Sequence, residues 1–324
     1  MLKYSFIIPV KEINNYVREA VPKILEIGRE DFEIILYVDI ANSETWLKTR
    51  QIATGPGGPA MKRSLAARDA QGEILVFIDD DAYPKKDFLE KLDEAFKNEN
   101  VVAVGGPAIT PANNNFWQKV SGAVFLSKLS GGFPERYAPV GSKKFIDDWP
   151  SVNLSVRKDA FAKVGGFKSS FWPGEDTLFC EELVKETGKN ILYDPAVIVF
   201  HHRREGFFRH LKQVGAYGLH RGFFAKKFGG ASLKLKYFLP SLFLLFIVLG
   251  AGLSFVSFLL FKLYIAGWAI YLLALLKALL DIKQYEASWL VALHSLYYIV
   301  ATHIVYGWHF LRGLFKKELV SKLR

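Results

Sequence analysis

Three consecutive carboxylates, Asp79, Asp80 and Asp81, directly follow the apolar run Ile74–Ile78. Adjacent negative charges repel one another, so such a triplet needs water or a cation around it. In an extended segment the side chains of Asp79 and Asp81 point to one side and that of Asp80 to the other. Two carboxylates on one side can hold Mg²⁺ or Mn²⁺, and such an ion binds phosphate groups. A solvated turn, or a cap for the helix expected after Pro84, explains the triplet equally well.

A second acidic pair, Glu175 and Asp176, opens a stretch of helical character that runs to Lys185. A carboxylate there could act as a general base and take the proton of an attacking hydroxyl group. Acidic residues in a first helical turn are also favoured by the helix dipole, which explains the pair without catalysis. On these residues alone both interpretations stay open.

Two histidines and two tryptophans lie near these motifs. His201 and His202 follow an apolar strand expected over Ile191–Phe200, where they could contact a metal or a diphosphate, or simply end the strand. Trp149 and Trp172 could stack on a sugar ring or pack in the core.

The elements that must position these side chains alternate between strands and helices. Strand-like apolar runs cover Tyr4–Pro9, Phe32–Val38, Ile74–Ile78 and Val101–Val104, and helical patterns cover 17–27, Ser64–Ala70 and Phe88–Phe96. This alternation predicts a doubly wound sheet whose ligands bind beyond the carboxyl ends of the strands. Asp39 and the acidic triplet both fall at such ends. The absence of a Gly-x-Gly-x-x-Gly or Gly-Lys-Ser/Thr loop argues against dinucleotide enzymes and P-loop NTPases.

Taken together, the motifs resemble glycosyltransferase family 2, the inverting enzymes of the GT-A fold. The matching residues occur in the same order over about residues 3–225: Ile8-Pro9, Asp39, 59–63, 72–74, 77–81, 153–157, 165–167 and 174–176. The resemblance implies an α/β fold of GT-A type, a doubly wound mixed sheet like that of nucleotide-diphospho-sugar transferases, followed by C-terminal transmembrane helices.

The family pattern implies a role for each matching residue. The donor, a UDP-, GDP- or dTDP-sugar, would be bound by Pro9, Asp39, Arg63, Asp79 and Asp80. The metal, Mg²⁺ or Mn²⁺, would be held by Asp79, Asp81 and His201. Asp176 would be the catalytic base with Glu175 beside it, and the acceptor side would include Asn153, Trp149 and Trp172. A base that activates the acceptor for direct attack predicts inversion at the anomeric carbon.

The sequence departs from the family pattern in three places. Ile40-Ala41-Asn42-Ser43 follows Asp39 where acidic or small polar residues are usual, and Ser64 stands where asparagine is common. A processive synthase would carry Gln-x-x-Arg-Trp, whereas residues 213–217 read Gln-Val-Gly-Ala-Tyr. We therefore expect non-processive transfer.

The composition changes in the last third of the chain. Of the 324 residues 51% are hydrophobic and 23% are charged, and no charged residue lies between Lys236 and Lys262. Such a run is long enough to cross a hydrocarbon core of roughly 30 Å. We expect spans at 237–260 and 263–280, and a third apolar helix at 287–311 that either spans or lies at the interface.

The domain organisation follows from this change. The expected parts are a catalytic domain over 1–204, basic interface helices over 205–236, a membrane region over 237–315 and a basic tail over 316–324. The formal net charge is +10, and its densest stretch precedes the first span. That position favours membrane lipids as the anionic partner rather than nucleic acid. Without a secretion signal, and with Cys180 as the one cysteine, the catalytic domain is expected in the cytoplasm of a multi-pass cell-membrane protein.

Three functions remain in competition. The leading hypothesis is a metal-dependent transferase that adds one sugar to a hydroxyl group of a lipid-linked saccharide or glycolipid, in the synthesis of a cell-envelope polysaccharide or glycolipid. The runner-up is a polyprenyl-phosphate glycosyltransferase, whose ionised phosphate acceptor needs no base. The third is a non-catalytic membrane protein that binds sugar nucleotides.

Overall fold

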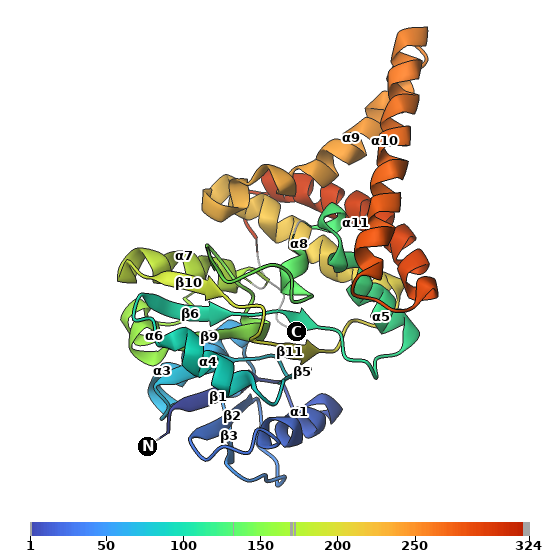
Figure 1. The fold of residues 1–324 in the computed structure, drawn as a ribbon. Coiled ribbons are helices and arrows are strands. Elements are labelled where there is room, and N and C mark those ends of the chain that lie inside the picture. Colours follow the sequence, from blue (N-terminus) through green and yellow to red (C-terminus); the bar gives the residue numbers. More distant parts are fainter. Residues whose placement is uncertain (1, 132, 169–170, 172, 320–324) are drawn as a thin grey trace. The chain divides into compact units, whose positions relative to one another are not determined.

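The computed structural model describes residues 2–131, 133–168, 171 and 173–319. These residues form two compact units (Figure 1). The α/β unit contains residues up to 111 together with 138–202, and the helical unit contains 112–137 together with 203–319. Segment 112–137 therefore packs with the helices, although the sequence placed it in a continuous domain over 1–204. The reason is local: Val120, Ala123 and Val124 in this segment join an apolar cluster with the helices that follow residue 203.

An eight-stranded mixed sheet forms the centre of the α/β unit, in the order β3-β2-β1-β4-β9-β6-β10-β8. Its strands are β1 (Tyr4–Pro9), β2 (Phe32–Val38), β3 (Thr49–Ala53), β4 (Ile74–Phe77), β6 (Val101–Gly105), β8 (Lys144–Ile146), β9 (Leu154–Arg157) and β10 (Asn190–Tyr193). Strands β3, β2, β1 and β4 run parallel, β9 is antiparallel to β4 and β6, and β8 is antiparallel to β10. This arrangement confirms the predicted doubly wound mixed sheet.

Helices cover both faces of this sheet (Figure 1). One apolar cluster joins the sheet to α1 (Asn15–Leu25) and α4 (Phe88–Phe96). The other joins it to α2 (Pro59–Ser64), α3 (Ala66–Asp69), α6 (Lys158–Val164) and α7 (Glu175–Thr187). Strands β1 and β2 are buried along their whole length, which explains why they read as continuous apolar runs rather than alternating ones.

A small second sheet has the order β5 (Ala82–Pro84), β11 (Val199–His201) and β7 (Ala108–Ile109). The sequence predicted a single strand over Ile191–Phe200, and this prediction is wrong because the segment divides into β10 and β11. Pro195 cannot donate a hydrogen bond to a sheet, and Asp194 forms a turn in which its carboxylate accepts the N–H of Ala196 at 2.9 Å. The chain thereby leaves the large sheet and enters the small one.

The helical unit contains α5 (Phe116–Ala123), α8 (Phe207–Lys227), α9 (Leu239–Leu253), α10 (Phe258–Lys283) and α11 (Trp289–Phe315). Single turns of 3-10 helix occur in the two units at Val124–Leu126, Lys128–Ser130, Pro134–Arg136, Ser151–Asn153, Gly230–Leu233 and Leu235–Tyr237. Two of the long helices, α10 and α11, are long and apolar enough to cross a membrane, which indicates membrane attachment.

The break between the first two apolar helices lies earlier than expected. The sequence separated the spans near Lys262, whereas α9 ends at Leu253 and α10 begins at Phe258 and continues through Lys262 to Lys283. The hydroxyl of Ser257 accepts the N–H of Leu260 at 3.2 Å and so caps α10. A capping residue, and not the charge at Lys262, thus decides where α10 begins.

Candidate active site

The acidic triplet and His201 come together where the two sheets of the α/β unit meet. Strand β4 ends at Phe77, the triplet follows, and β5 begins at once with Ala82. Because β11 pairs with β5 in antiparallel register, His201 lies opposite Ala82. Its Nε2 is 3.1 Å from Oδ1 of Asp81. Ligand atoms of Asp79, Asp81 and His201 all lie within 4.8 Å of one another.

This cluster has the chemistry of a divalent cation site. Two carboxylates and one imidazole suit Mn²⁺ well, because Mg²⁺ prefers ligands that are all oxygen. The side chain of Asp79 is 35% exposed, whereas those of Asp81 and His201 are more buried. An ion held here would therefore keep one side open for phosphate oxygens.

Arg63 connects the acidic triplet to the start of α7. It lies on the short helix α2, and its side chain is 3% exposed. One guanidinium nitrogen, Nη2, is 2.5 Å from Oδ1 of Asp79, and the other, Nη1, is 3.0 Å from Oε1 of Glu175. The planar guanidinium is suited to such a bridge between two carboxylates. The proposed metal ligand and the proposed catalytic helix are thus joined through one side chain.

Glu175 and Asp176 differ in their surroundings although they are neighbours. Helix α7 begins after Gly174, whose φ of 113° lies in the region that favours glycine. Glu175 is buried, and burial raises the pKa of its carboxyl group; the negative charge of Asp176 raises that pKa further and Arg63 opposes the shift. The negative charge of Asp79 also raises the pKa of Glu175.

Asp176 is half-buried, and backbone N–H groups orient its carboxylate. Oδ1 accepts the N–H of Thr177 at 2.9 Å, and Oδ2 accepts the N–H of Ser151 at 3.4 Å. Because Glu175 is buried against Arg63, Asp176 is the member of the pair that an acceptor could reach. The geometry therefore favours Asp176 as the base.

The ends of β1 and β2 are joined by Lys62, which the sequence analysis missed. Its buried Nζ contacts the carboxylate of Asp39 and donates to the carbonyl of Val10 at 2.6 Å. Val10 follows Pro9, the buried last residue of β1. The available signal was the adjacent pair Lys62-Arg63, which the structure places in the last turn of α2. Both side chains are buried there, and each is paired with a carboxylate of its own.

Asp80 lies in a turn rather than in the extended segment that the sequence suggested, and its carboxylate is bonded to the start of α1. Its Oδ2 accepts a hydrogen bond of 2.6 Å from Nδ2 of Asn14. The Oδ1 of Asn14 in turn accepts the N–H of Val17 at 3.0 Å and caps α1. The acidic triplet is therefore anchored to the first turn of α1.

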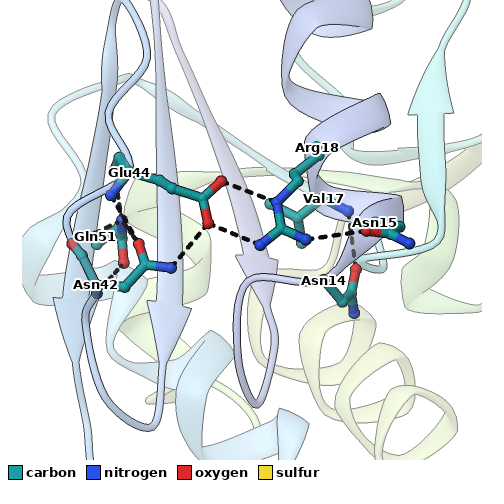
Figure 2. Close-up of polar contacts among 7 residues, drawn as sticks. All are labelled: Asn14, Asn15, Val17, Arg18, Asn42, Glu44 and Gln51. Carbon is teal, nitrogen blue, oxygen red and sulfur yellow. Dashed lines mark hydrogen bonds and ion pairs between the residues drawn. The ribbon is translucent and has the colours of Figure 1, made fainter.

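The first turn of α1 also holds the loop that follows Asp39. Figure 2 shows Arg18 donating two hydrogen bonds to Glu44, at 2.8 and 2.9 Å, and one to Asn15 at 3.0 Å. Glu44 and Asn42 are linked to each other, and Gln51 of β3 donates to Oδ1 of Asn42 at 2.9 Å (Figure 2). These contacts order the loop between β2 and β3 beside the end of β2.

The acceptor residues expected from the sequence are packed inside the α/β unit. Asn153 is fully buried, and its Nδ2 donates to the carbonyls of Val197 at 2.8 Å and Pro107 at 3.1 Å. Trp149 is also buried, and its Nε1 donates to the carbonyl of Gly106 at 2.9 Å. Both contacts favour a structural role. Trp172 lies outside the described residues.

His202, which the sequence offered beside His201 as a contact to a metal or a diphosphate, is bonded elsewhere in the structure. Its backbone N–H donates to the carbonyl of Asp81 at 2.9 Å, and its Nε2 lies 2.9 Å from Oε2 of Glu19. The alternation of a strand sends the two histidines in different directions. His201 meets the acidic triplet, and His202 fastens β11 to α1.

Comparison with known proteins finds one family whose model matches part of this chain. Residues 5–163 match the model of "Glycosyl transferase family 2". Over 147 residues the chain is 29% identical to a pre-mycofactocin glycosyltransferase of Mycobacterium tuberculosis, covering 45% of this chain and 30% of that protein.

A second relative comes from Methanococcus voltae. It is a "Dolichyl N-acetyl-alpha-D-glucosaminyl phosphate 3-beta-D-2,3-diacetamido-2,3-dideoxy-beta-D-glucuronosyltransferase", 26% identical over 164 residues, with 49% of this chain and 50% of that protein covered. The chain thus spans at most half the length of these two curated relatives.

A solved structure is similar over nearly the whole chain. The mannosyltransferase PcManGT from Pyrobaculum calidifontis, in complex with GDP-Man and Mn²⁺, has a TM-score of 0.56 and 17% identity, and 98% of this chain and 88% of that chain are covered. This likeness shows the GT-A fold.

Proposed function

Residues 5–163 are a glycosyltransferase family 2 domain, and from this premise we propose that the protein is a glycosyltransferase with an inverting, metal-dependent and non-processive reaction. The donor is a nucleotide-sugar, and the acceptor is a hydroxyl group of a lipid-linked saccharide or glycolipid at the membrane. The observation that carries the proposal is the chain of contacts from the Asp79, Asp81 and His201 cluster through Arg63 to the start of α7.

Each residue of that chain has a task in the reaction. Asp79, Asp81 and His201 would hold a divalent cation, which would supply positive charge beside the departing nucleoside diphosphate. Arg63 keeps Asp79 in place and adds a positive charge beside the diphosphate. Asp176 takes the proton of the acceptor hydroxyl as its oxygen bonds to the anomeric carbon and the bond from that carbon to the phosphate oxygen breaks. Attack from the face opposite the leaving group inverts the anomeric configuration.

Asp39 and the loop behind it are suited to the nucleoside end of the donor. Asp39 is fixed by Lys62, and the loop is ordered by Arg18 and Glu44. Both lie at the carboxyl end of β2, and ligands of doubly wound sheets bind beyond such ends. The panel of donors described below identifies which nucleotide this end of the sheet binds.

Two features support a lipid-linked acceptor. Helices α10 and α11 indicate membrane attachment, and the Methanococcus relative is named for a dolichyl-phosphate-linked acceptor. We propose a cytoplasmic catalytic domain because the basic residues of 203–236 precede the first apolar helix, and basic residues tend to stay on the cytoplasmic side.

The test uses purified full-length protein in detergent with UDP-, GDP- and dTDP-sugars, with and without Mn²⁺. A donor that binds the folded state should raise the melting midpoint only when Mn²⁺ is present. If no donor does so, the metal-dependent donor site is wrong. Release of nucleoside diphosphate from the stabilising donor should follow, and binding without turnover or hydrolysis would instead support a non-catalytic protein.

Asp176→Asn separates the two acceptor classes. Loss of general base catalysis should lower turnover by about 10²- to 10⁴-fold while the donor still stabilises the protein. Near-normal turnover with a polyprenyl phosphate would show that the acceptor is already ionised, which is the competing function. Asp159→Asn, on the exposed start of α6, is the matched control and should retain activity.

A further inference from the structure

We propose that the helical unit enters the membrane only through the hairpin of α9 and α10, and that α11 lies along the membrane surface, paired with the basic helix α8. By length and composition α11 could equally cross a bilayer. The contacts within the helical unit argue against that crossing.

Helices α8 and α11 run side by side over the length of α8. Near their starts, the rings of Phe207 and Tyr298 are 4.9 Å apart. One turn on, Nε2 of His210 is 2.9 Å from the hydroxyl of Thr302. Further along, a Cβ added to Gly222 would lie 2.1 Å from the carbonyl oxygen of Phe310. The two backbones therefore touch, and α11 must lie at the same depth as α8 from about residue 298 onward.

Helix α8 cannot lie in hydrocarbon. It carries five fixed positive charges, at Arg209, Lys212, Arg221, Lys226 and Lys227. Charged side chains inside a bilayer are costly, and anionic headgroups attract them to its surface. Arg209, Lys212, Lys226 and Lys227 are exposed, and the aromatic side chains of Phe208 and Tyr217 are exposed beside them. Basic and aromatic side chains together are typical of a helix at the membrane interface.

Helix α11 has an exposed apolar face, which a helix lying at the membrane interface needs in order to contact lipid. Its covered faces pack on α8, α9, α5 and α10, whereas Leu293, Tyr297, Ile304, Trp308 and Phe315 are exposed. These five recur at intervals of four, seven, four and seven residues, which on a helix form one apolar stripe. A bilayer surface accommodates such a stripe with the helix lying flat.

The hairpin of α9 and α10 is different because Lys262 is the one charged residue between Leu239 and Leu276. The most apolar window of α10 has none of its 18 residues buried, and Phe255 at the tip is 91% exposed. Phe246 of α9 packs on Tyr264 of α10 with ring centroids 5.1 Å apart, so the two helices form an antiparallel pair. Figure 1 shows the end at which α9 and α10 join extending away from α8 and α11, while the other ends of the two helices pack on α11.

The distribution of charge agrees with a single inserted hairpin. Basic residues before α9, at the end of α10 and after α11 then all lie on one side, in agreement with the positive-inside tendency. Lys262, close to the tip, is the exception, and its long side chain can reach the headgroup region. If α11 crossed instead, Lys316 and Lys317 would lie on the opposite side from α8.

The test places single cysteines at exposed positions in a Cys180→Ala background. The variants are Glu205→Cys before α8, Val256→Cys at the tip, Gln284→Cys before α11 and Lys317→Cys after α11. Sealed vesicles of known orientation are treated with a membrane-impermeant maleimide. Positions 205, 284 and 317 should react from the same side, and position 256 should not react from that side.

Each other labelling pattern overturns the proposal. Reaction of position 317 from the opposite side means that α11 spans, and reaction of position 284 from the opposite side means that α10 and α11 are the two spans. Reaction of position 256 together with position 205 means that no hairpin is inserted. The cysteine-free parent should remain unlabelled, and detergent should make all four positions reactive. Labelling needs no substrate, so its outcome is independent of the donor and base assignments.

Discussion

The α/β unit and the long apolar helices α9 to α11 bury polar side chains of different kinds. In the α/β unit the buried groups include charged residues that meet at strand ends, among them Lys62, Arg63, Asp81 and Glu175. Among the described residues of α9 to α11, the buried polar groups are Ser241, Ser295, Thr302 and His303. A buried ion must be paired, and pairing also prepares it to bind a charged ligand. Near lipid, water cannot assist, so hydrogen bonds of neutral groups and close backbone contacts hold the helices.

This contrast predicts that substitutions at the strand ends and substitutions between the helices damage different properties of the protein. Removal of a charge at the strand ends should reduce catalysis while the fold persists, because several neighbouring charges remain to satisfy one another. Added volume between the helices should reduce stability while the chemistry of the surviving protein is unchanged.

The largest effect is expected for Asp79→Asn. An asparagine can still accept a hydrogen bond from Arg63, so the fold should persist, but the cation loses one of its two carboxylates. We expect turnover to fall by about a thousandfold, or several kcal/mol of lost transition-state stabilisation. Donor-dependent turnover is measured across a Mn²⁺ titration, together with the melting midpoint.

Two comparisons sharpen that prediction. Glu90→Gln removes an exposed carboxylate on α4 and should leave turnover unchanged. Asp80→Asn should lose less than Asp79→Asn, because the Asp80 side chain is turned toward Asn14. Equal losses at positions 79 and 80 would contradict the arrangement of ligands described above.

The next largest effect is on stability, in the helical unit. In Gly222→Ala the new methyl group would lie 2.1 Å from the carbonyl oxygen of Phe310, so α8 and α11 must move apart. Such overpacking costs about 1–3 kcal/mol, which outweighs the gain of up to about 1 kcal/mol from replacing glycine in a helix. The melting midpoint in detergent should fall, and turnover per folded molecule should stay constant.

Gly252→Ala provides the matched control. Gly252 also lies in a helix, but nothing is within 4 Å of the site of its added methyl group. This variant should melt no lower than the parent. If both glycine variants lower the midpoint equally, close contact of α8 and α11 is not what holds the helical unit.

Local sequence patterns predicted the parts of the α/β unit that are buried most uniformly. Strands β1 and β2 and helix α4 have the expected bounds, because continuous apolar runs and one amphipathic period leave little choice. Local patterns could not predict the order of the strands in the sheet. Strand β9 (Leu154–Arg157) has only four residues, and its place between β4 and β6 depends on long-range pairing.

Some residues of the candidate site were likewise visible in local sequence patterns, and others were not. Asp79, Asp81 and Asp176 were visible because carboxylates gathered at the end of a strand and the start of a helix. The contact of Lys62 with Asp39 joins residues 23 positions apart, and no local period encodes it. The sequence placed the start of the second apolar helix too late. The run between Lys236 and Lys262 has no charged residue, so nothing in its charge pattern marks the turn between α9 and α10 that ends at Ser257.

A smaller effect is expected in the pH dependence of stability, to which the buried carboxyl group of Glu175 contributes. The pKa of Glu175 is raised from 4.5 to about 7, so the folded state holds this proton more tightly than the unfolded state does. The stability that Glu175 contributes is complete below its ordinary pKa and is lost as the pH rises through about 7. In Glu175→Gln this loss should vanish.

The measurement compares melting midpoints of the parent and Glu175→Gln across that pH range, with a chelator present. The gap between the two proteins should move in favour of the variant as the pH rises, since glutamine stays neutral and can still accept a hydrogen bond from Arg63. A constant gap would mean that Glu175 is ionised throughout, and that its contact with Arg63 is an ion pair.

The smallest effect is expected for Arg18→Gln, which removes the pair drawn in Figure 2. Exposed ion pairs contribute little to stability because water and salt screen them, so the melting midpoint should barely change. What the pair does is hold the loop between β2 and β3, and backbone amides of residues 40–48 should therefore exchange faster with deuterium. Lys23→Gln is the matched control: it breaks an equally exposed pair with Glu26 at the other end of α1, far along the helix from Arg18 and its loop partners. Faster exchange in both variants would show a general loosening of α1, whereas faster exchange in Arg18→Gln alone would show that one exposed pair orders the loop behind Asp39.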